Sequence, residues 1–288
     1  MKRLSIIILL LFLLTGCASP APEADIAATT LPVYEFTARL CQGTDLTITR
    51  LITEPVSCLH DYSLSVRQVK AIEQADLVVL SGAGLEDFMS GVLDGKNVVD
   101  ASAGVELLSC EHDHDHGHEH HDHETDSHIW LSPSNAMQMA TNICKELSLR
   151  YPQHSAVFSA NLSALLADLQ TLEAYGNEQL SDLACRELIT FHDGFGYLAN
   201  SFDLQILAAV EEESGSEASA AELKELIGMV CEHNLPAIFT EKSGSVSAAG
   251  IISRETGVKI YDLDMAMAGS SYFDAMYHNI NTIKEALQ

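Results

Sequence analysis

Basic residues are scarce in this chain. Its 288 residues include 15 Lys and Arg against 41 Asp and Glu, which gives a formal net charge of −26. A surface this acidic disfavours nucleic acid and anionic lipid headgroups, and it attracts cations. We therefore expect no nucleic-acid partner, and we expect a ligand that carries positive charge.

The usual motifs of enzyme chemistry are also missing. There is no glycine-rich phosphate loop, no Gly-x-Ser-x-Gly elbow and no isolated catalytic cysteine. The segment His118-Glu119-His120-His121-Asp122 comes near the His-Glu-x-x-His motif of metalloproteases, but Asp122 stands where the second His must be. An enzyme is therefore not predicted, and a zinc hydrolase remains only as an alternative.

Long apolar runs are confined to the start of the chain. Leu4–Leu14 is too short to span a bilayer, and it follows the basic pair Lys2 and Arg3. Leu14-Thr15-Gly16-Cys17 then resembles a bacterial lipobox, which implies cleavage before Cys17 and a lipid on its thiol. We expect a protein that is anchored outside the cytoplasm, on the bacterial cell membrane. The alternative is an ordinary signal peptide with an incidental cysteine.

Histidine is abundant in one place. Residues 111–133 read EHDHDHGHEHHDHETDSHIWLSP and hold eight of the 13 histidines, interleaved with Asp and Glu. Imidazole and carboxylate together suit zinc, so we interpret the run as a metal-capture loop rather than a solvated polar stretch or a purification tag. His128 lies where the composition turns apolar, and it should be on ordered chain. The expected low-affinity ligands are His112, His114, His116, His118, His120, His121 and His123.

Cysteines beyond Cys17 are few and lack CxxC spacing, so a cysteine zinc cluster is not predicted. An even number in an exported protein favours disulfides, although six cysteines allow 15 pairings and the sequence does not choose among them. Cys58 lies two residues before His60, and a thiolate ligand there is a less favoured alternative. The six are Cys41, Cys58, Cys110, Cys144, Cys185 and Cys231.

Short β-rich runs alternate with helical patterns, which predicts an α/β fold with two parallel-sheet lobes. A run of leucines at helical spacing predicts one long helix over 154–182, about 43 Å at 1.5 Å per residue, which would join the lobes. The expected strands are 26–30, 46–52, 76–81, 97–100, 187–192, 204–210, 237–241 and 258–263. The expected helices besides the long one are 33–41, 65–75, 85–93, 134–150, 219–233, 246–256 and 272–287.

These patterns divide the chain into five parts. They are a lipoprotein signal peptide (1–16), a lipid anchor and tether (17–25), an N-terminal lobe (26–152) with its His-rich loop (111–127), a linking helix (153–183) and a C-terminal lobe (184–288).

Metal-capable residues fall where the predicted strands end. Ligands bind beyond the carboxyl ends of the strands in open parallel sheets. His60, His192, Glu241 and Asp264 follow or close four strands, and His128 re-enters the fold after the loop. Three histidines and one carboxylate would close a tetrahedral zinc shell in the cleft between the lobes.

Four segments carry a resemblance to a known family. They are Leu31-Pro32-Val33-Tyr34, Leu59-His60-Asp61-Tyr62 with Ala75–Glu86, His128–Ala136, and Phe191–Leu198, with a tail around Leu263-Asp264 and Tyr272. With them the chain resembles the zinc-binding lipoproteins of bacterial metal ABC importers, in the cluster that binds zinc or manganese. The resemblance spans residues 26–288.

The resemblance implies a ligand set of His60, His128, His192 and Asp264, with Glu241 as the alternative acid. A histidine at the position of His192 is typical of zinc members, and a glutamate there of manganese members. The sequence departs from the family pattern at Leu59, where a proline usually precedes the first ligand, and at Ser127 and Ser132 around the second. These changes remove no ligand.

The implied function is high-affinity capture of Zn²⁺ outside the cytoplasm and its delivery to an ABC permease with its ATPase, by a lipid-anchored monomer. Zinc is then cargo rather than a catalytic cofactor. The alternatives are a manganese-binding member of the same cluster, and a zinc buffer or adhesin without transport.

Other conspicuous residues receive simpler interpretations. We expect His154, His233 and His278 to be exposed or locally hydrogen-bonded, and Glu211–Glu213 to form a solvated loop rather than a partner contact. Met265, Met267 and Met276 are interpreted as core residues rather than a copper site.

Overall fold

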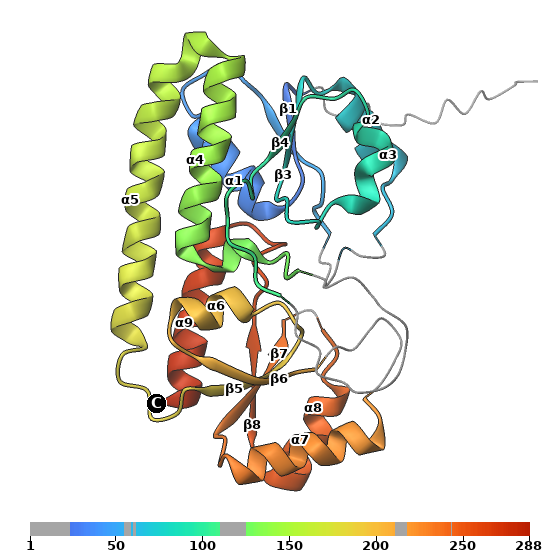
Figure 1. Ribbon diagram of the computed structural model, residues 1–288, viewed down its shortest axis with the longest axis vertical. Helices are drawn as coiled ribbons and strands as arrows, with labels where there is room; N and C mark the ends of the chain where they lie inside the picture. The colour runs from blue at the N-terminus through green and yellow to red at the C-terminus, as the bar shows by residue number, and fades with distance from the viewer. Residues whose placement is uncertain (1–23, 55–58, 60–61, 110–124, 211–217, 243) are drawn as a thin grey trace, which may run out of the picture.

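Two parallel sheets, one in each lobe, form the framework of the molecule (Figure 1). The computed structural model describes residues 24–54, 59, 62–109, 125–210, 218–242 and 244–288. Both sheets have four strands and the same topology, with orders β2-β1-β3-β4 and β6-β5-β7-β8. The predicted α/β class with two parallel-sheet lobes is confirmed.

The first sheet is short, and its two central strands are buried. β1 and β3 consist of apolar side chains almost throughout, as expected for strands that helices cover on both faces. Its register pairs Ile26 with both Ile48 and Leu77, and Val79 with Val99. The strands are β1 (Ile26–Ala28), β2 (Ile48–Arg50), β3 (Leu77–Leu80) and β4 (Val98–Asp100).

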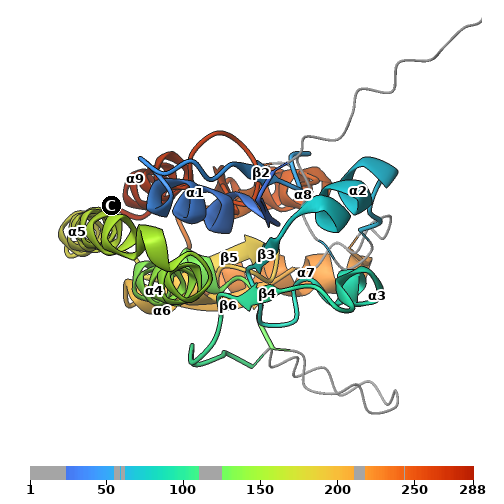
Figure 2. The same cartoon turned by 90° about the horizontal axis from the view of Figure 1, so that it is seen from above.

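Local signals in the sequence position the helices of this lobe. Pro32 lies in the first turn of α1, where a missing N–H costs nothing. Ser65 and Gln68 form a capping box that begins α2. Viewed from above, α2 and α3 lie at the end of the molecule opposite α4 and α5 (Figure 2). The bounds are α1 (Leu31–Leu40), α2 (Val66–Gln74) and α3 (Ser90–Leu93).

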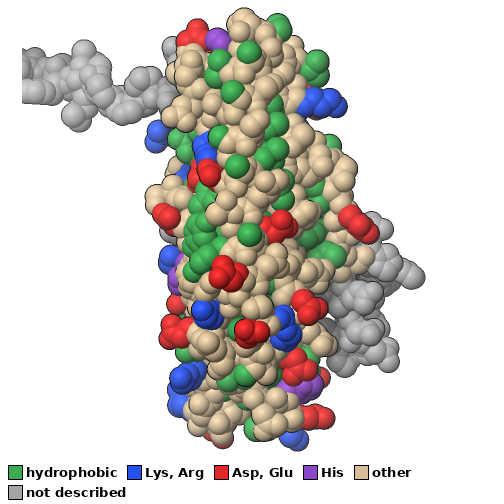
Figure 3. Space-filling model, turned by 90° about the vertical axis from the view of Figure 1, so that its left-hand side faces the viewer, with side chains coloured by type: hydrophobic (Ala, Val, Ile, Leu, Met, Phe, Trp, Pro, Cys, Tyr) green, Lys and Arg blue, Asp and Glu red, His purple; other side chains and the backbone are tan. Residues whose placement is uncertain are grey.

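A long helix runs alongside both lobes, as predicted, although it is shorter than expected. α5 (Ser155–Gln179) has 25 residues and packs antiparallel to α4 (Pro133–Arg150) (Figure 1). Its inner face buries Phe158, Leu165 and Leu169. Its outer face exposes mainly small uncharged residues, and few charged side chains appear on the upper part of that face (Figure 3). None of the described helices is apolar over a sufficient length to cross a bilayer.

The second sheet repeats the pattern of the first, and three of its four helices, α7, α8 and α9, lie within one residue of their predicted bounds, whereas α6 was not predicted. A capping box of Ser219 and Glu222 begins α7, and Gly257 ends α8 in the left-handed conformation at φ 79°. The strands are β5 (Glu187–Phe191), β6 (Gln205–Ala209), β7 (Ala237–Glu241) and β8 (Lys259–Leu263). The helices are α6 (Gly196–Ser201), α7 (Ala220–Glu232), α8 (Ser247–Thr256) and α9 (Tyr272–Leu287).

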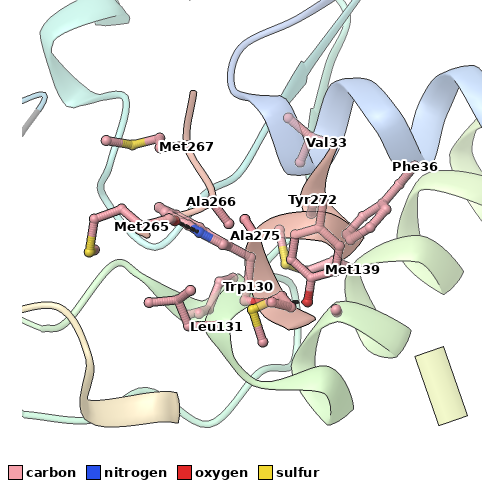
Figure 4. Close-up of a cluster of buried hydrophobic side chains, with 14 of the residues drawn as sticks. Val33, Phe36, Trp130, Leu131, Met139, Met265, Ala266, Met267, Tyr272 and Ala275 are labelled. Atoms are coloured by element: carbon pink, nitrogen blue, oxygen red, sulfur yellow. Dashed lines mark hydrogen bonds between the residues drawn. The ribbon is translucent and has the colours of Figure 1, made fainter. Parts of the chain in front are cut away.

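The larger of two hydrophobic clusters joins the lobes, and the smaller one lies within the C-terminal lobe. The main buried cluster extends from β1 and β3 through α4 and α5 to Phe239, Met265 and Tyr272. Trp130, the only tryptophan, donates from Nε1 to the carbonyl oxygen of Met265 at 2.8 Å, and its own carbonyl accepts from the Tyr272 hydroxyl at 2.8 Å (Figure 4). The methionines interpreted as core are buried: Met265, Met267 and Met276 are at most 3% exposed.

The disulfide expectation is wrong for the cysteines that the structure describes, because all four are free thiols. Cys41 and Cys144 pack into the core as small apolar residues, and burial raises the pKa of the Cys41 thiol to about 12. Cys185 donates weakly to the carbonyl oxygen of Glu187, and Cys231 is exposed on α7. Cys58 and Cys110 lie outside the described residues.

Candidate metal centre

His128 is held by a carboxylate. Both its Nδ1 and its backbone N lie 2.8 Å from Oδ1 of Asp126, and both residues are buried. An ionised carboxylate only accepts hydrogen bonds, so Nδ1 carries the ring proton. The lone pair of Nε2 is then free for a metal ion, which is the usual arrangement of histidine ligands with a carboxylate behind them.

His192 meets His128 at the junction of the two lobes. It follows the last residue of β5, and its Nε2 lies 3.4 Å from Nε2 of His128, with the two ring planes at 86°. Two nitrogens at about 2.0–2.1 Å from one tetrahedral zinc ion would be about 3.3–3.4 Å apart. The observed separation matches that spacing, and it is also the distance of a hydrogen bond between the two rings.

Glu241 lies on the other side of the His192 ring. It is the last residue of β7, the neighbour of β5, and Oε2 lies 3.8 Å from Nδ1 of His192. This distance is too long for a hydrogen bond. Glu241 is thus placed behind His192 much as Asp126 is behind His128, rather than beside the paired Nε2 atoms.

Asp264 follows β8, the next strand of the sheet, and its carboxylate contacts two groups. Oδ1 accepts from the backbone N of Ala266 at 2.8 Å, and Oδ2 lies 3.1 Å from Nζ of Lys242. Asn279 holds the backbone N and carbonyl oxygen of Asp264, each at 2.7 Å. As the sequence pattern predicts, Asp264 lies at the carboxyl end of its strand, but the pattern gives no sign of the Lys242 contact.

Close packing leaves little room around the histidine pair. A Cβ atom on Gly194 would lie 2.8 Å from Cδ2 of His192, 2.9 Å from Cε1 of His128 and 2.6 Å from Cε of Met265. These distances are shorter than carbon contacts allow. Any larger residue at position 194 would push against the two histidine rings and Met265. Trp130 makes an edge contact with His128, with ring centroids 5.4 Å apart.

The chain on either side of the His-rich run is tied together. Ser109 bridges Thr125 in antiparallel fashion, and the backbone N of Asp126 donates to the carbonyl oxygen of Leu108 at 3.0 Å. The Tyr197 hydroxyl lies 2.9 Å from the backbone N of Leu108 and donates to the carbonyl oxygen of Asp126 at 3.0 Å. Sequence reasoning missed Tyr197 as part of this arrangement.

Two parts of the predicted metal chemistry lie outside the described residues. These are His60 and the seven loop histidines from His112 to His123. The predicted lipidation residue, Cys17, also lies outside the described residues. Among the residues that the structure describes, no group of three or more His, Cys, Asp or Glu side chains forms a ready metal site. The histidines with simpler interpretations contact nearby carboxylates: His154 with Asp45, His233 with Glu187 and His278 with Asp262.

Comparison with known proteins places the whole fold in one family. Residues 26–286 match the family model of ZnuA, described as zinc-uptake complex component A, periplasmic. The zinc-binding lipoprotein AdcA of Streptococcus pneumoniae (strain ATCC BAA-255 / R6) is 32% identical over 310 residues, which cover 99% of this chain and 61% of AdcA. The chain therefore spans about three fifths of the length of that relative.

Solved structures agree with this result. A crystal structure of ZnuA superposes with a TM-score of 0.79 at 28% identity, covering 92% of this chain and 100% of that one. FpvC from Pseudomonas aeruginosa, in complex with Mn²⁺, gives a TM-score of 0.79 at 26% identity, covering 92% and 98%. From the family match over residues 26–286 and these likenesses, we conclude that the chain belongs to the ZnuA family of metal-binding proteins.

Proposed function

We propose that this protein captures Zn²⁺ outside the cytoplasm and delivers it to an ABC permease that works with an ATPase. The observation that carries the proposal is the pair of Nε2 atoms of His128 and His192, 3.4 Å apart, which matches the nitrogen spacing around a tetrahedral zinc ion. The family match and the zinc-binding relative support it.

The proposed ligand set is His60, His128, His192 and Asp264. His60 would supply the third imidazole from the first lobe. Asp264 is preferred to Glu241 because Glu241 lies on the Nδ1 side of His192, away from the shared position between the Nε2 atoms. A shell of three nitrogens and one oxygen has no position open for water, so the proposal involves transport and no catalysis.

The remaining parts of the proposal concern the chain beyond the site. Residues 1–16 would be a signal peptide, and Cys17 would carry a lipid that holds a monomer at the outer face of the cell membrane. The histidines from His112 to His123 would collect zinc weakly and raise its concentration near the tight site. The loaded lobes, residues 26–152 and 184–288 joined by 153–183, would then dock on the permease.

Manganese is the second candidate cargo, because a structural neighbour of this fold was solved with Mn²⁺. The donor set favours zinc, since imidazole nitrogen suits zinc whereas manganese prefers carboxylate and other oxygen donors. His192→Glu would replace one such nitrogen with oxygen. It should weaken zinc binding more than manganese binding.

Competition with a chelator for each metal tests the assignment. His128→Ala and His192→Ala should each weaken zinc binding at least about tenfold, because one strong donor is lost from a four-ligand shell. His278→Ala is the matched control, since this histidine contacts Asp262 near the surface and should change zinc affinity little. Unchanged zinc affinity in both His128→Ala and His192→Ala would contradict the assignment of these histidines as ligands. A wild type that prefers manganese would correct the cargo.

A further inference from the structure

A lysine faces the candidate metal ligand Asp264 at the edge of the second sheet. β7 and β8 pair in parallel up to Glu241 and Leu263, and the backbone N of Lys242 continues the ladder to the carbonyl oxygen of Leu263 at 2.9 Å. Lys242 and Asp264 are thus the first residues beyond these two strands. Their side chains meet, with Nζ 3.1 Å from Oδ2.

The contact uses the carboxylate oxygen that is not otherwise bonded within its own loop. Oδ1 of Asp264 accepts from the backbone N of Ala266, and Asn279 fixes the backbone on both sides. Ala266 adopts a left-handed conformation at φ 54°, so the turn after Asp264 is held in one shape. A metal ion that binds through Oδ2 must therefore share that oxygen with Lys242 or displace its ammonium group.

The side chain of Lys242 is suited to being displaced. It is 57% exposed, whereas that of Asp264 is 18% exposed. An ion pair with one partner this exposed is weak, and lysine carries its charge on a flexible stem. The ammonium group can move into water while the carboxylate stays in place. Its positive charge, close to a divalent cation, opposes metal binding at the same oxygen.

We propose that Lys242 competes with zinc for Asp264 and thereby lowers the affinity of the site and speeds release. This inference rests on the proposed function. The lysine substitutes for the metal charge at Asp264 when zinc leaves, so the acid is not left unpaired at the edge of the sheet. Faster release would help a carrier that must transfer its metal ion to a permease.

Lys242→Gln tests the proposal, with Lys259→Gln as the matched control. Lys259 is exposed at the opposite end of β8, so both variants lose one positive charge from the same sheet. Lys242→Gln should bind zinc roughly 1.5- to fivefold more tightly and release it more slowly to a fast chelator, the range set by one exposed ion pair. Lys259→Gln should match the wild type. The difference should shrink in about 1 M salt, where charges are screened within about 3 Å.

A double variant separates the proposed pairing from a general charge effect. In an Asp264→Asn background, Lys242→Gln should change zinc affinity little, because the carboxylate that the lysine contacts is already gone. An equal gain with and without Asp264 would overturn competition at this residue, and so would a Lys242→Gln protein that binds zinc no more tightly than Lys259→Gln. A wild type without any tight zinc site would instead contradict the proposed function. Thermal unfolding of each variant would check that the fold is kept.

Discussion

At the scale of single residues, the carboxylate behind a histidine decides which ring nitrogen is left to bind a metal ion. Asp126 fixes the tautomer and the orientation of His128 by accepting two hydrogen bonds from it, one from Nδ1 and one from the backbone N. A neutral amide in its place would keep the shape and lose the charge. Partners of this kind typically change metal affinity about 10–100-fold when they are altered.

We therefore expect Asp126→Asn to weaken zinc binding by about tenfold or more, with little change in the fold. Chelator competition measures the affinity, and thermal unfolding checks the fold. Asp45→Asn is the matched control, because Asp45 makes a similar 2.9 Å contact with His154 on the surface. Equal zinc affinities of the Asp126→Asn and Asp45→Asn variants would show that the Asp126 carboxylate does not contribute to zinc binding.

Only part of the candidate site could be predicted from the sequence. The position of His192 could be predicted because it closes a β-rich run, and that of His128 because the composition turns apolar directly after it. The roles of Asp126 and Glu241 behind the rings, and the contact of Lys242 with Asp264, depend on side-chain directions set by the packed fold. No spacing in the sequence encodes them. The ligand role of His60 stays a prediction.

At the scale of elements, the central strands β1, β3, β5 and β7 could be predicted because buried parallel strands are nearly continuous apolar runs. All eight expected strands occur, and β7 has the predicted bounds of 237–241. α6 was missed because a six-residue helix that begins at Gly196 is too short for periodicity to reveal. The long helix ends at Gln179, before the predicted 182.

The carboxyl ends of β1 and β3 enclose a buried acid, Glu86, that is not among the proposed metal ligands. Glu86 accepts hydrogen bonds from the Thr29 hydroxyl at 2.6 Å and from the backbone N of Ser81 and Gly82 at 2.8 and 3.0 Å. Burial nevertheless raises the pKa of Glu86 from its ordinary 4.5 to about 7. The folded protein thus binds this proton more tightly than the unfolded chain does.

A raised pKa in the folded state stabilises the protein when the group is protonated. The contribution of Glu86 should be complete below about pH 4.5 and lost as the pH rises through about 7. Glu86→Gln cannot ionise. The free energy of unfolding of the wild type minus that of Glu86→Gln should therefore fall between about pH 5 and pH 8.

Urea unfolding across that range measures the difference. Glu255→Gln serves as the matched control, because Glu255 is exposed on α8 and should give a difference that varies little with pH. The difference in unfolding free energy between wild type and Glu86→Gln could instead stay constant from about pH 5 to pH 8. The three hydrogen bonds to Glu86 would then outweigh its burial and keep the carboxylate charged.

At the scale of the whole molecule, the larger hydrophobic cluster spans both lobes, and the lobes meet at the histidine pair. Trp130 and Tyr272 link the segment after the histidine run to the loop after β8, so the two halves of the site are held by direct contacts between the lobes. The segments flanking residues 110–124 are tied at the bridge between Ser109 and Thr125. We therefore expect the proposed tight site and the histidine run to be separable parts of the molecule.

Replacing residues 110–124 with Asn-Gly should test this separation. Ser109 and Thr125 are already antiparallel partners, and a two-residue turn of this type closes such a pair. Asp126 should keep its place, because the carbonyl oxygen of Leu108 and the Tyr197 hydroxyl hold its backbone independently of the replaced segment. Calorimetry should show the weak zinc sites lost and one tight site retained, with its affinity changed by less than about twofold.

A full-length variant with the loop histidines changed to asparagine separates the two effects of that replacement, because it removes the imidazoles without shortening the chain. It should also lose the weak sites and keep the tight one, since neutral imidazole is the metal donor in the run. Suppose instead that the shortened chain loses the tight site while the asparagine variant keeps it. The run would then be needed to shape the site around His128, and capture by the loop would not be its main role. The changed residues are His112, His114, His116, His118, His120, His121 and His123.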